Sequence, residues 1–389
     1  MLKQKPVIVV NRSTPFAAEV FAHLGEVIAL ESAEVTNKTV RDADILIVRS
    51  ETKVDKTLLE GSRVRFVGTV TIGTDHIDRS YLNSKGITFA SAPGSNANSV
   101  AEYVVAGLLT WVGRTGQSLK GKTIGIVGVG NVGSKVVNVV LALGMIPLLN
   151  DPPRARKESE SSFLPLDELM NADFITLHVP LATSGDDATL HLFDKQQIGK
   201  MKRGSVLINT SRGAVVETAA LQNALASTHL STAILDVWEH EPVINKELLD
   251  RVMLGTPHIA GYSLDGKLNA LKMVYEDVCN FLDVQPDWSV DAGAPEGSSR
   301  LQLPAHLKNE MALAFAVRQA YDIELDDSLL REASAITDGR PGEHFMNLRA
   351  EYRIRREFGN FEVQLYQVGP GAVLQQLGFR TLVQETARL

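Results

Sequence analysis

A glycine-rich turn stands between an apolar run typical of a buried strand and an apolar run typical of a helix. It reads Gly128-Val129-Gly130-Asn131-Val132-Gly133, at the end of the β-branched run 123–129 and before the apolar stretch 136–149. Glycines at this spacing allow a pyrophosphate to approach the backbone at a helix N-terminus. The context predicts a dinucleotide site, and the expected cofactor-binding residues are Gly128, Gly130, Asn131, Val132 and Gly133.

An acidic residue follows the glycine turn at the distance that a ribose contact needs. Asp151 lies 18 residues past Gly133, at the end of the next apolar run. A carboxylate there accepts hydrogen bonds from ribose hydroxyls and repels a 2′-phosphate. Arg154 and Arg156 follow closely and could receive such a phosphate instead. Because a carboxylate occupies the ribose position, we expect NAD rather than NADP.

Short β-branched runs alternate with helical patterns along most of the chain. They lie at residues 7–10, 45–48, 64–67, 123–129, 145–149, 174–177, 205–209, 232–236 and 252–254. This alternation predicts an α/β fold with parallel sheets covered on both faces, and the last six runs make one complete doubly wound unit. A long helix is expected from Asn98 or Ser99, because Ser99 and Glu102 have the spacing of a capping box.

The chain changes character near residues 284–299, which are rich in Pro, Asp, Gly and Ser. We interpret this stretch as a linker. Beyond it the pattern predicts helices at 305–320 and 341–358 and an alternating strand at 361–365. These elements indicate a small appended α+β domain.

Composition excludes several function classes. The net charge of −7 argues against a general nucleic-acid or anionic-membrane surface, although local basic pockets remain compatible with it. The lone cysteine, Cys279, cannot form an intramolecular disulfide or a thiolate metal site, and we expect it to be a small buried side chain. Since we find no signal peptide or membrane span, we expect a cytoplasmic protein. We also expect no bound metal.

Three further polar segments each follow a predicted strand, at 209–213, 236–242 and 256–261. Ligands of open α/β sheets bind at that edge. A nicotinamide enzyme that oxidises a 2-hydroxy acid needs a carboxylate-binding fork, a base for the hydroxyl proton and a partner for the base. Arg212 can bind the carboxylate, His258 can act as the base, and Glu241 can be the partner of that base.

Each of these assignments has an alternative. Arg212 could form a surface salt bridge, and His258 could be a core histidine with satisfied hydrogen bonds. Glu241 would bind the far nitrogen of the imidazole ring and stabilise the imidazolium. Its neighbours Glu239 and His240 are competing assignments.

The glycine turn, Asp151 and the three polar segments resemble the D-specific 2-hydroxyacid dehydrogenase family over roughly residues 1–285. The resemblance implies two Rossmann-like domains with parallel sheets, one of them flavodoxin-like, and an active site between them formed by Arg212, Glu241 and His258. It implies a substrate-binding domain of residues 1–98 and 259–285, an NAD-binding domain of residues 99–258, and a C-terminal dimerisation domain of residues 286–389.

Narrower motifs at 48–50, 66–78, 211–216 and 258–263, together with the C-terminal domain, resemble one branch of this family. That resemblance implies a small phosphorylated hydroxy acid as substrate and a homodimer. By motif position the substrate residues are Ser50, Thr71 and Tyr262, with Thr69 as the alternative to Thr71. The remaining cofactor residues implied are Val179, Asp236 and Gly261.

A phosphorylated substrate requires further cations. Arg49, beside Ser50, is one candidate, and Arg349 or Arg353 of a dimer partner is another, although a solvated helix face is the simpler account of those two. Some positions depart from the family pattern. The loop Asn11-Arg12-Ser13-Thr14-Pro15 stands where acidic residues are expected, Val70 and Ile72 are bulkier than expected, and Val179 stands where a hydroxyl residue is common.

Two other functions compete with this interpretation. Another enzyme of the family, such as a 3-phosphoglycerate dehydrogenase, acts on a similar acid, but the C-terminal domain argues against it. An NAD-sensing scaffold would keep the fold, but we find no peptide-binding motif in the linker or tail. A purely structural protein is hard to reconcile with Arg212, Glu241 and His258 beside a nucleotide fingerprint.

Overall fold

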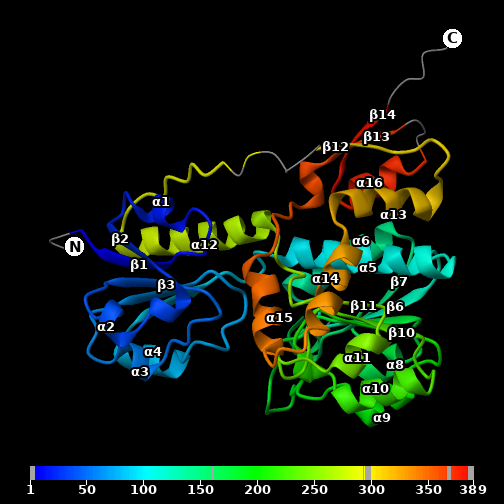
Figure 1. The fold of residues 1–389 in the computed structure, drawn as a ribbon, viewed down its shortest axis with the longest axis horizontal. Helices are drawn as coiled ribbons and strands as arrows, with labels where there is room; N and C mark the ends of the chain where they lie inside the picture. Colours follow the sequence, from blue (N-terminus) through cyan, green and yellow to red (C-terminus); the bar gives the residue numbers. More distant parts are fainter. Residues whose placement is uncertain (1–4, 159–161, 292, 294–298, 366–368, 384–389) are drawn as a thin grey trace. The chain divides into compact units, whose positions relative to one another are not determined.

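The computed structural model describes residues 5–158, 162–291, 293, 299–365 and 369–383 (Figure 1). The chain forms two compact units, and we describe each by itself. The first combines Met1–Asn96 with Ser263–Gly293, and the second combines Ala97–Tyr262 with Ala294–Leu389. The described residues from 299 onward thus belong to the same unit as Ala97–Tyr262, and the division into three domains stays a prediction.

The first unit is built on a five-stranded parallel sheet in the order β2-β1-β3-β4-β5. This is the flavodoxin-like order. The strands are β1 Val7–Asn11, β2 Glu26–Leu30, β3 Ile45–Val48, β4 Phe66–Thr69 and β5 Thr88–Ser91. The sequence did not indicate β2 and β5, because both are edge strands with several half-exposed or exposed positions that interrupt the apolar pattern.

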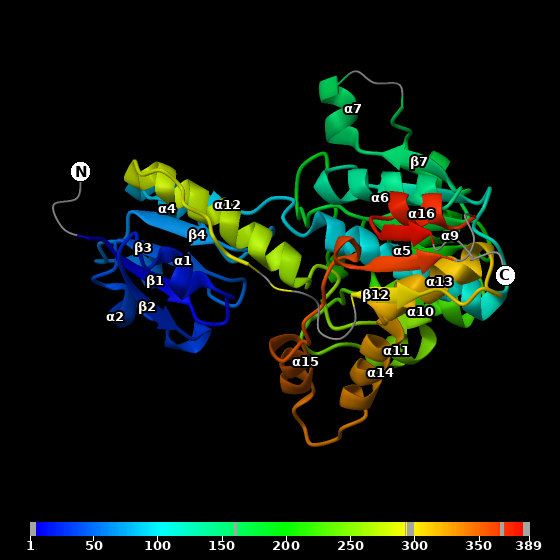
Figure 2. The ribbon, with the colours of Figure 1, turned by 90° about the horizontal axis from the view of Figure 1, so that it is seen from above.

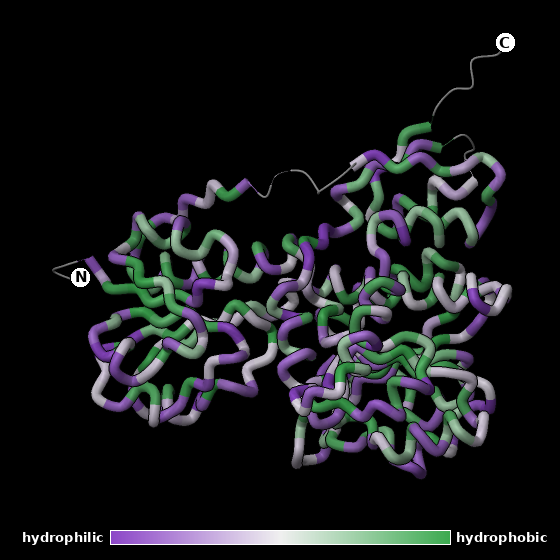
Figure 3. The backbone as a smooth tube through the Cα atoms, in the orientation of Figure 1, coloured by the Kyte–Doolittle hydropathy of each residue, from purple (hydrophilic) through white to green (hydrophobic). Residues whose placement is uncertain are grey.

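Helices cover both faces of this sheet, as Figure 1 shows. They are α1 Ala17–Phe21, α2 Asn37–Val40, α3 Lys56–Leu59, α4 Arg79–Lys85 and α12 Leu264–Leu282. Alternate side chains of each strand enter opposite cores: Ile8 and Val10 pack with α1 and α12, whereas Val9 packs with α2, α3 and α4. In Figure 3 the central strands are accordingly hydrophobic along their length.

The second unit contains a six-stranded parallel sheet in the order β11-β10-β9-β8-β6-β7. Its strands are β6 Thr123–Val127, β7 Ile146–Asn150, β8 Phe174–Leu177, β9 Val206–Asn209, β10 Thr232–Leu235 and β11 Leu254–Gly255. The chain goes from β6 outward to β7 and then returns to β8 on the other side of β6. Ligands of such sheets bind at this reversal, beyond the carboxyl ends of the strands.

One face of this sheet carries α5 Ala97–Thr115 and α6 Asn131–Ala142, and the other carries shorter helices. These are α8 Leu166–Leu169, α9 Lys195–Lys200, α10 Thr218–Ala226 and α11 Lys246–Arg251, while α7 Pro152–Glu158 follows β7. Helix α5 is buried along most of its length. The predicted α/β fold with parallel sheets is confirmed.

The C-terminal region adds a three-stranded parallel sheet, β12-β13-β14, and four helices. The elements are β12 Arg300–Gln302, α13 Asn309–Ala320, α14 Ile323–Ser334, α15 Pro341–Ala350, β13 Glu362–Leu365, α16 Gly371–Gln376 and β14 Arg380–Val383. Helix α13 packs on α5, and α14 lies beside α15 (Figure 2). The helix expected at 341–358 was predicted too long, since it ends at Ala350.

The expected capping box at Ser99 is also wrong. Helix α5 begins at Ala97, so both residues lie within the helix. The Ser99 hydroxyl donates to Glu357 at 2.7 Å, and the Glu102 carboxylate accepts from the Phe358 amide at 2.7 Å. These polar side chains therefore bind the C-terminal region instead of capping the N-terminus of a helix. Among the residues that the structure describes, no helix is long and apolar enough to cross a membrane.

Candidate active site

The glycine turn after β6 leaves space for an anion. Gly128 has a φ of +86°, and a Cβ there would lie 2.7 Å from the His178 carbonyl oxygen. A Cβ on Gly133 would lie 2.0 Å from the Gly128 carbonyl oxygen, whereas one on Gly130 would meet nothing within 4 Å. Two glycines thus permit close packing and the third faces open space. No side chain caps the first turn of α6, which fits a bound pyrophosphate.

Asp151 holds the turn from the end of β7. Its Oδ2 accepts a hydrogen bond from the Val129 amide at 2.8 Å, and its Oδ1 accepts one from the Arg154 amide at 3.1 Å. The Arg154 guanidinium is committed to the Val129 carbonyl and to Glu158. Arg156 also pairs with a carboxylate. Because both arginines are engaged with carboxylates, the arrangement fits a ribose with free hydroxyls better than one with a 2′-phosphate.

The loops after β10 and β11 bring an imidazole and a carboxylate together. His258 Nδ1 lies 2.8 Å from Glu241 Oε2, and the Glu241 Oε1 atom accepts from the Trp238 amide at 2.7 Å. The two side chains are 32% and 21% exposed, so the pair is partly open to solvent. Glu239 is engaged elsewhere, 2.7 Å from His191 Nε2. The structure therefore pairs Glu241, and not Glu239, with His258.

Glu241 is an ionised partner for this histidine. Burial alone would raise the pKa of its carboxyl group. The charge of His258, the hydrogen bonds from His258 and Trp238, and the charge of Arg349 outweigh burial and hold the pKa below its usual value. The carboxylate can therefore orient the ring and stabilise the imidazolium that forms when His258 takes up a proton.

Asp236, at the end of β10, fixes the turn that carries His258. This buried carboxylate accepts hydrogen bonds from the Thr256 hydroxyl at 2.7 Å and from the amides of Ile259 and Ala260 at 2.7 and 2.9 Å. Burial raises its pKa, which the charge of His258 and these hydrogen bonds oppose. His258 itself has a φ of +57°, a strained conformation that this network maintains.

A second turn presents Arg212. The buried Asn209 side chain donates to the Arg212 carbonyl at 3.0 Å and accepts from the Ser211 amide at 3.0 Å, which closes the turn after β9. A Cβ on Gly213 would lie 1.9 Å from the Trp238 carbonyl oxygen. This close approach of two backbones needs glycine. It sets the Arg212 turn directly against the loop that carries Glu241.

The C-terminal region contributes an arginine near the same carboxylate. Arg349 of α15 donates to the Tyr262 hydroxyl at 2.8 Å and stacks on that ring, and its charge helps to lower the pKa of Glu241. Arg353 instead pairs with the buried Asp326. The sequence suggests both arginines for a dimer partner's site, and in the structure Arg349 lies beside Tyr262 of its own chain. No pattern in the sequence could have located it there.

The substrate residues expected in the first unit follow β3 and β4. Arg49 and Ser50 leave β3, and Thr71 lies two residues beyond β4. Thr69 is buried, with its hydroxyl 2.7 Å from that of Thr71 and 3.0 Å from His76 Nε2. The partly exposed Thr71 is thus the better placed of the two threonines for a ligand.

Sequence reasoning missed His178, which directly follows β8 and lies beside the glycine turn. Its ring nitrogens lie 2.9 and 3.1 Å from the hydroxyls of Thr176 and Thr210. Burial lowers the pKa of His178 to about 3, so the ring is neutral at pH 7. Next to it, Val179 approaches Gly128 closely. The cofactor roles expected for Val179, Asp236 and Gly261, and the roles of Arg212, Glu241 and His258, remain predictions.

Together, the doubly wound sheet, the glycine turn and the Arg212, Glu241 and His258 loops define a nicotinamide-dependent dehydrogenase. Residues 87–260 match the family described as D-isomer specific 2-hydroxyacid dehydrogenase, NAD binding domain, and residues 295–378 match a domain of unknown function. The chain belongs to the D-isomer specific 2-hydroxyacid dehydrogenase family. It is thus an NAD-dependent enzyme that acts on a CH–OH group, as the motifs predicted.

Two relatives that match nearly the whole chain are erythronate-4-phosphate dehydrogenases. An erythronate-4-phosphate dehydrogenase of Salinibacter ruber is 45% identical over 90% of this chain and 92% of its own length. One of Cronobacter sakazakii is 43% identical over 96% and 97%.

Solved structures confirm the fold over a smaller part of the chain. The NAD-bound 3-phosphoglycerate dehydrogenase of Entamoeba histolytica has a TM-score of 0.62 at 27% identity, covering 72% of this chain and 96% of its own. A D-lactate dehydrogenase of Aquifex aeolicus, complexed with NAD and lactic acid, has a TM-score of 0.59 at 28% identity, covering 71% and 95%.

Proposed function

We propose that this enzyme oxidises 4-phospho-D-erythronate to (R)-3-hydroxy-2-oxo-4-phosphooxybutanoate, a reaction of pyridoxal 5′-phosphate biosynthesis. Relatives named for this substrate match more than 90% of their own length. The observation that carries the chemistry is the 2.8 Å contact between His258 and Glu241, on a loop next to the Arg212 turn.

In the proposed reaction Arg212 binds the substrate carboxylate. Its planar fork presents two donors to two oxygens and thereby orients C2. The outer nitrogen of His258 takes the proton of the C2 hydroxyl, and Glu241 holds the ring and stabilises the imidazolium. NAD, when bound, accepts the hydride from C2, so that the C2–O bond becomes a carbonyl.

The cofactor would be held by the glycine turn, with Asp151 at the ribose and Val179, Asp236 and Gly261 nearer the nicotinamide. Ser50, Thr71 and Tyr262 would contact the substrate hydroxyls, and Arg49 its phosphate. These residues supply hydroxyl groups and a permanent cation, which a phosphorylated polyhydroxy acid requires.

The rival substrate is 3-phosphoglycerate, because a structure similar to this chain belongs to a dehydrogenase of that acid. We expect NADH formation, followed at 340 nm, to give a higher kcat/KM with 4-phosphoerythronate than with 3-phosphoglycerate. A preference for 3-phosphoglycerate would refute the proposed substrate. Absence of turnover with either acid, in protein that binds NAD, would instead favour an NAD-sensing scaffold.

We further propose that the enzyme is a cytoplasmic homodimer. The C-terminal region supports association, since β14 is an edge strand whose Leu382 and Val383 side chains are 47% and 49% exposed. Packing of this region against a second copy of the chain would remove these apolar side chains from water. Sedimentation equilibrium should give twice the 42.3 kDa mass of one chain, and Leu382→Lys should lower it toward one chain. A monomeric wild-type protein at micromolar concentration would contradict this expectation.

A further inference from the structure

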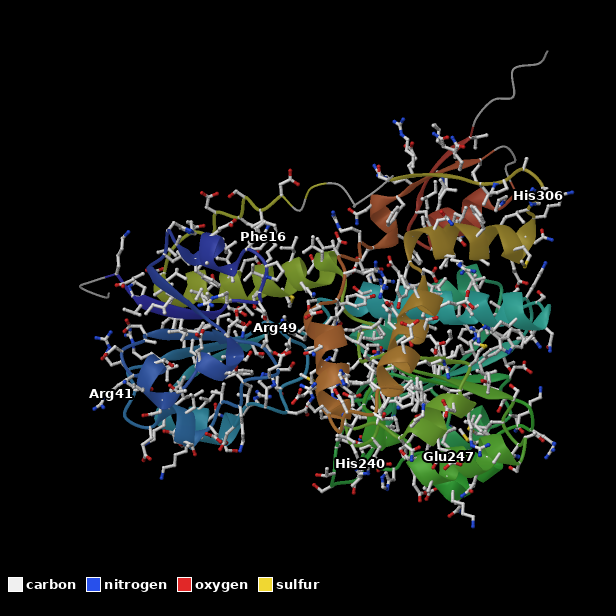
Figure 4. All side chains as sticks on the ribbon, viewed as in Figure 1. Phe16, Arg41, Arg49, His240, Glu247 and His306 are labelled. Atoms are coloured by element: carbon white, nitrogen blue, oxygen red, sulfur yellow. The ribbon has the colours of Figure 1, made fainter. Side chains whose placement is uncertain are left out.

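A cationic group lies at the carboxyl end of the sheet in the first unit. Arg49, labelled in Figure 4, follows β3 and donates to the Ser13 hydroxyl at 2.7 Å, where Ser13 follows β1. The other terminal nitrogen of Arg49 is 3.6 Å from the Glu51 carboxylate. The Arg49 side chain is only 18% exposed. Neighbours on two loops therefore hold this guanidinium at the edge where ligands of parallel sheets bind.

A lysine of α12 lies near the same guanidinium. Lys267 is in the first turn of this helix, which Ser263 begins by accepting a hydrogen bond from the Gly266 amide at 2.8 Å. Burial and the positive charge of Arg49 lower the pKa of Lys267 to about 8. The negative charge of Glu51 acts in the opposite direction and is outweighed. Two cations brought together in a partly buried place disfavour each other's charge, and an anion bound between them reverses that cost.

We infer that Arg49 and Lys267 together bind the phosphate group of the substrate at the carboxyl end of the first sheet. This inference rests on the proposed function, and it adds Lys267 to the substrate-binding residues. The guanidinium supplies a directed fork and the ammonium a compact charge, a combination suited to a dianion. Ser13 beside Arg49 is a neutral hydroxyl, so the one carboxylate that pairs with Arg49 in the described residues is that of Glu51, and two cations outnumber it.

The first test compares a phosphorylated and an unphosphorylated acid. Lys267→Met keeps the length of the side chain and removes its charge. For 4-phosphoerythronate we expect kcat/KM to fall about 10- to 100-fold, the effect of losing a charge-assisted hydrogen bond. For erythronate, which has no phosphate, we expect little change. The matched control is Lys272→Met, on the same helix, where an exposed lysine lies 3.9 Å from Glu276.

The second test measures binding without turnover. Sulfate, a dianion that does not titrate between pH 7 and pH 9.5, is titrated calorimetrically into the NAD-saturated enzyme. Because Lys267 loses its proton near pH 8, the affinity of the wild-type protein for sulfate should fall as the pH rises through that value. In Lys267→Arg the cation stays charged, so affinity should be kept at high pH.

The outcomes separate this inference from the proposed function. Equal losses of kcat/KM with both acids, or an equal loss in Lys272→Met, would overturn the phosphate role of Lys267. If Lys267→Met proves unstable on heating, the Lys267→Arg variant provides the test. A fall of its sulfate affinity with rising pH equal to that of the wild-type protein would also overturn the phosphate role of Lys267. If the wild-type enzyme does not oxidise 4-phosphoerythronate, the proposed function fails, and sulfate binding still decides whether the two cations form an anion site.

Discussion

Replacing His258 with alanine is expected to lower kcat by about 10²- to 10⁴-fold, the range for removal of a positioned general base. The substrate hydroxyl would then lose its proton to water while the hydride leaves. The binding of NAD should persist, because the glycine turn and Asp151 lie on other loops. Stopped-flow measurement of NADH formation at saturating NAD and substrate gives the rate directly.

The matched control for this variant is His240→Ala. His240 is an exposed histidine one residue before Glu241, and it competes with Glu241 for the role of the partner of the base. Its removal should leave kcat near the wild-type value. Added imidazole should restore part of the activity of His258→Ala. Near-normal turnover of His258→Ala would refute the base role of His258. A larger loss of turnover in His240→Ala would assign the base role to His240 instead.

Replacing Arg212 with lysine is expected to lower kcat/KM by about 10- to 100-fold, because one ammonium cannot reproduce two directed hydrogen bonds to a carboxylate. Lysine keeps the positive charge, so the loss of kcat/KM measures the contribution of the guanidinium's two directed hydrogen bonds. The variant should fold normally, since the turn is closed by the Asn209 side chain through backbone groups of Ser211 and Arg212. Steady-state kinetics and thermal unfolding measure the two effects separately.

The control for geometry is Arg203→Lys, which changes an exposed arginine whose guanidinium is 3.3 Å from the Thr228 hydroxyl. We expect unchanged kinetics there. Full activity of Arg212→Lys would show that the carboxylate is bound by another group. A loss confined to thermal stability would assign Arg212 a structural role only.

Local patterns in the sequence are sufficient for the nucleotide site. The glycine turn needs three residues without Cβ atoms at short spacing, and Asp151 reaches the Val129 amide from the next strand of the same unit. Parallel strands also bring Arg212, Glu241 and His258 to one sheet edge, because every such strand ends there. The fold class, the glycine turn and Asp151 therefore follow from periodicity and spacing along the chain, whereas Ser50, Thr71 and Tyr262 are implied only by the resemblance to the family.

Choosing among those candidates depends on contacts between segments far apart in the chain. Glu239 and Glu241 are equivalent by sequence, and the contact with His191 or with His258 separates them. The edge strands β2 and β5 carry too weak an apolar pattern to be predicted, since one side of each lacks a neighbouring strand.

Arg349 and Lys267 illustrate the same limit more strongly. Each lies on a helix surface where an arginine or lysine is ordinarily solvated, and nothing in its local pattern indicates a ligand. Helix packing brings Arg349 to Tyr262 and Lys267 near Arg49. Spacing along the chain specifies which chemical groups a sheet edge receives. Partial burial and long-range charge, which depend on how the helices pack, specify which of them act together.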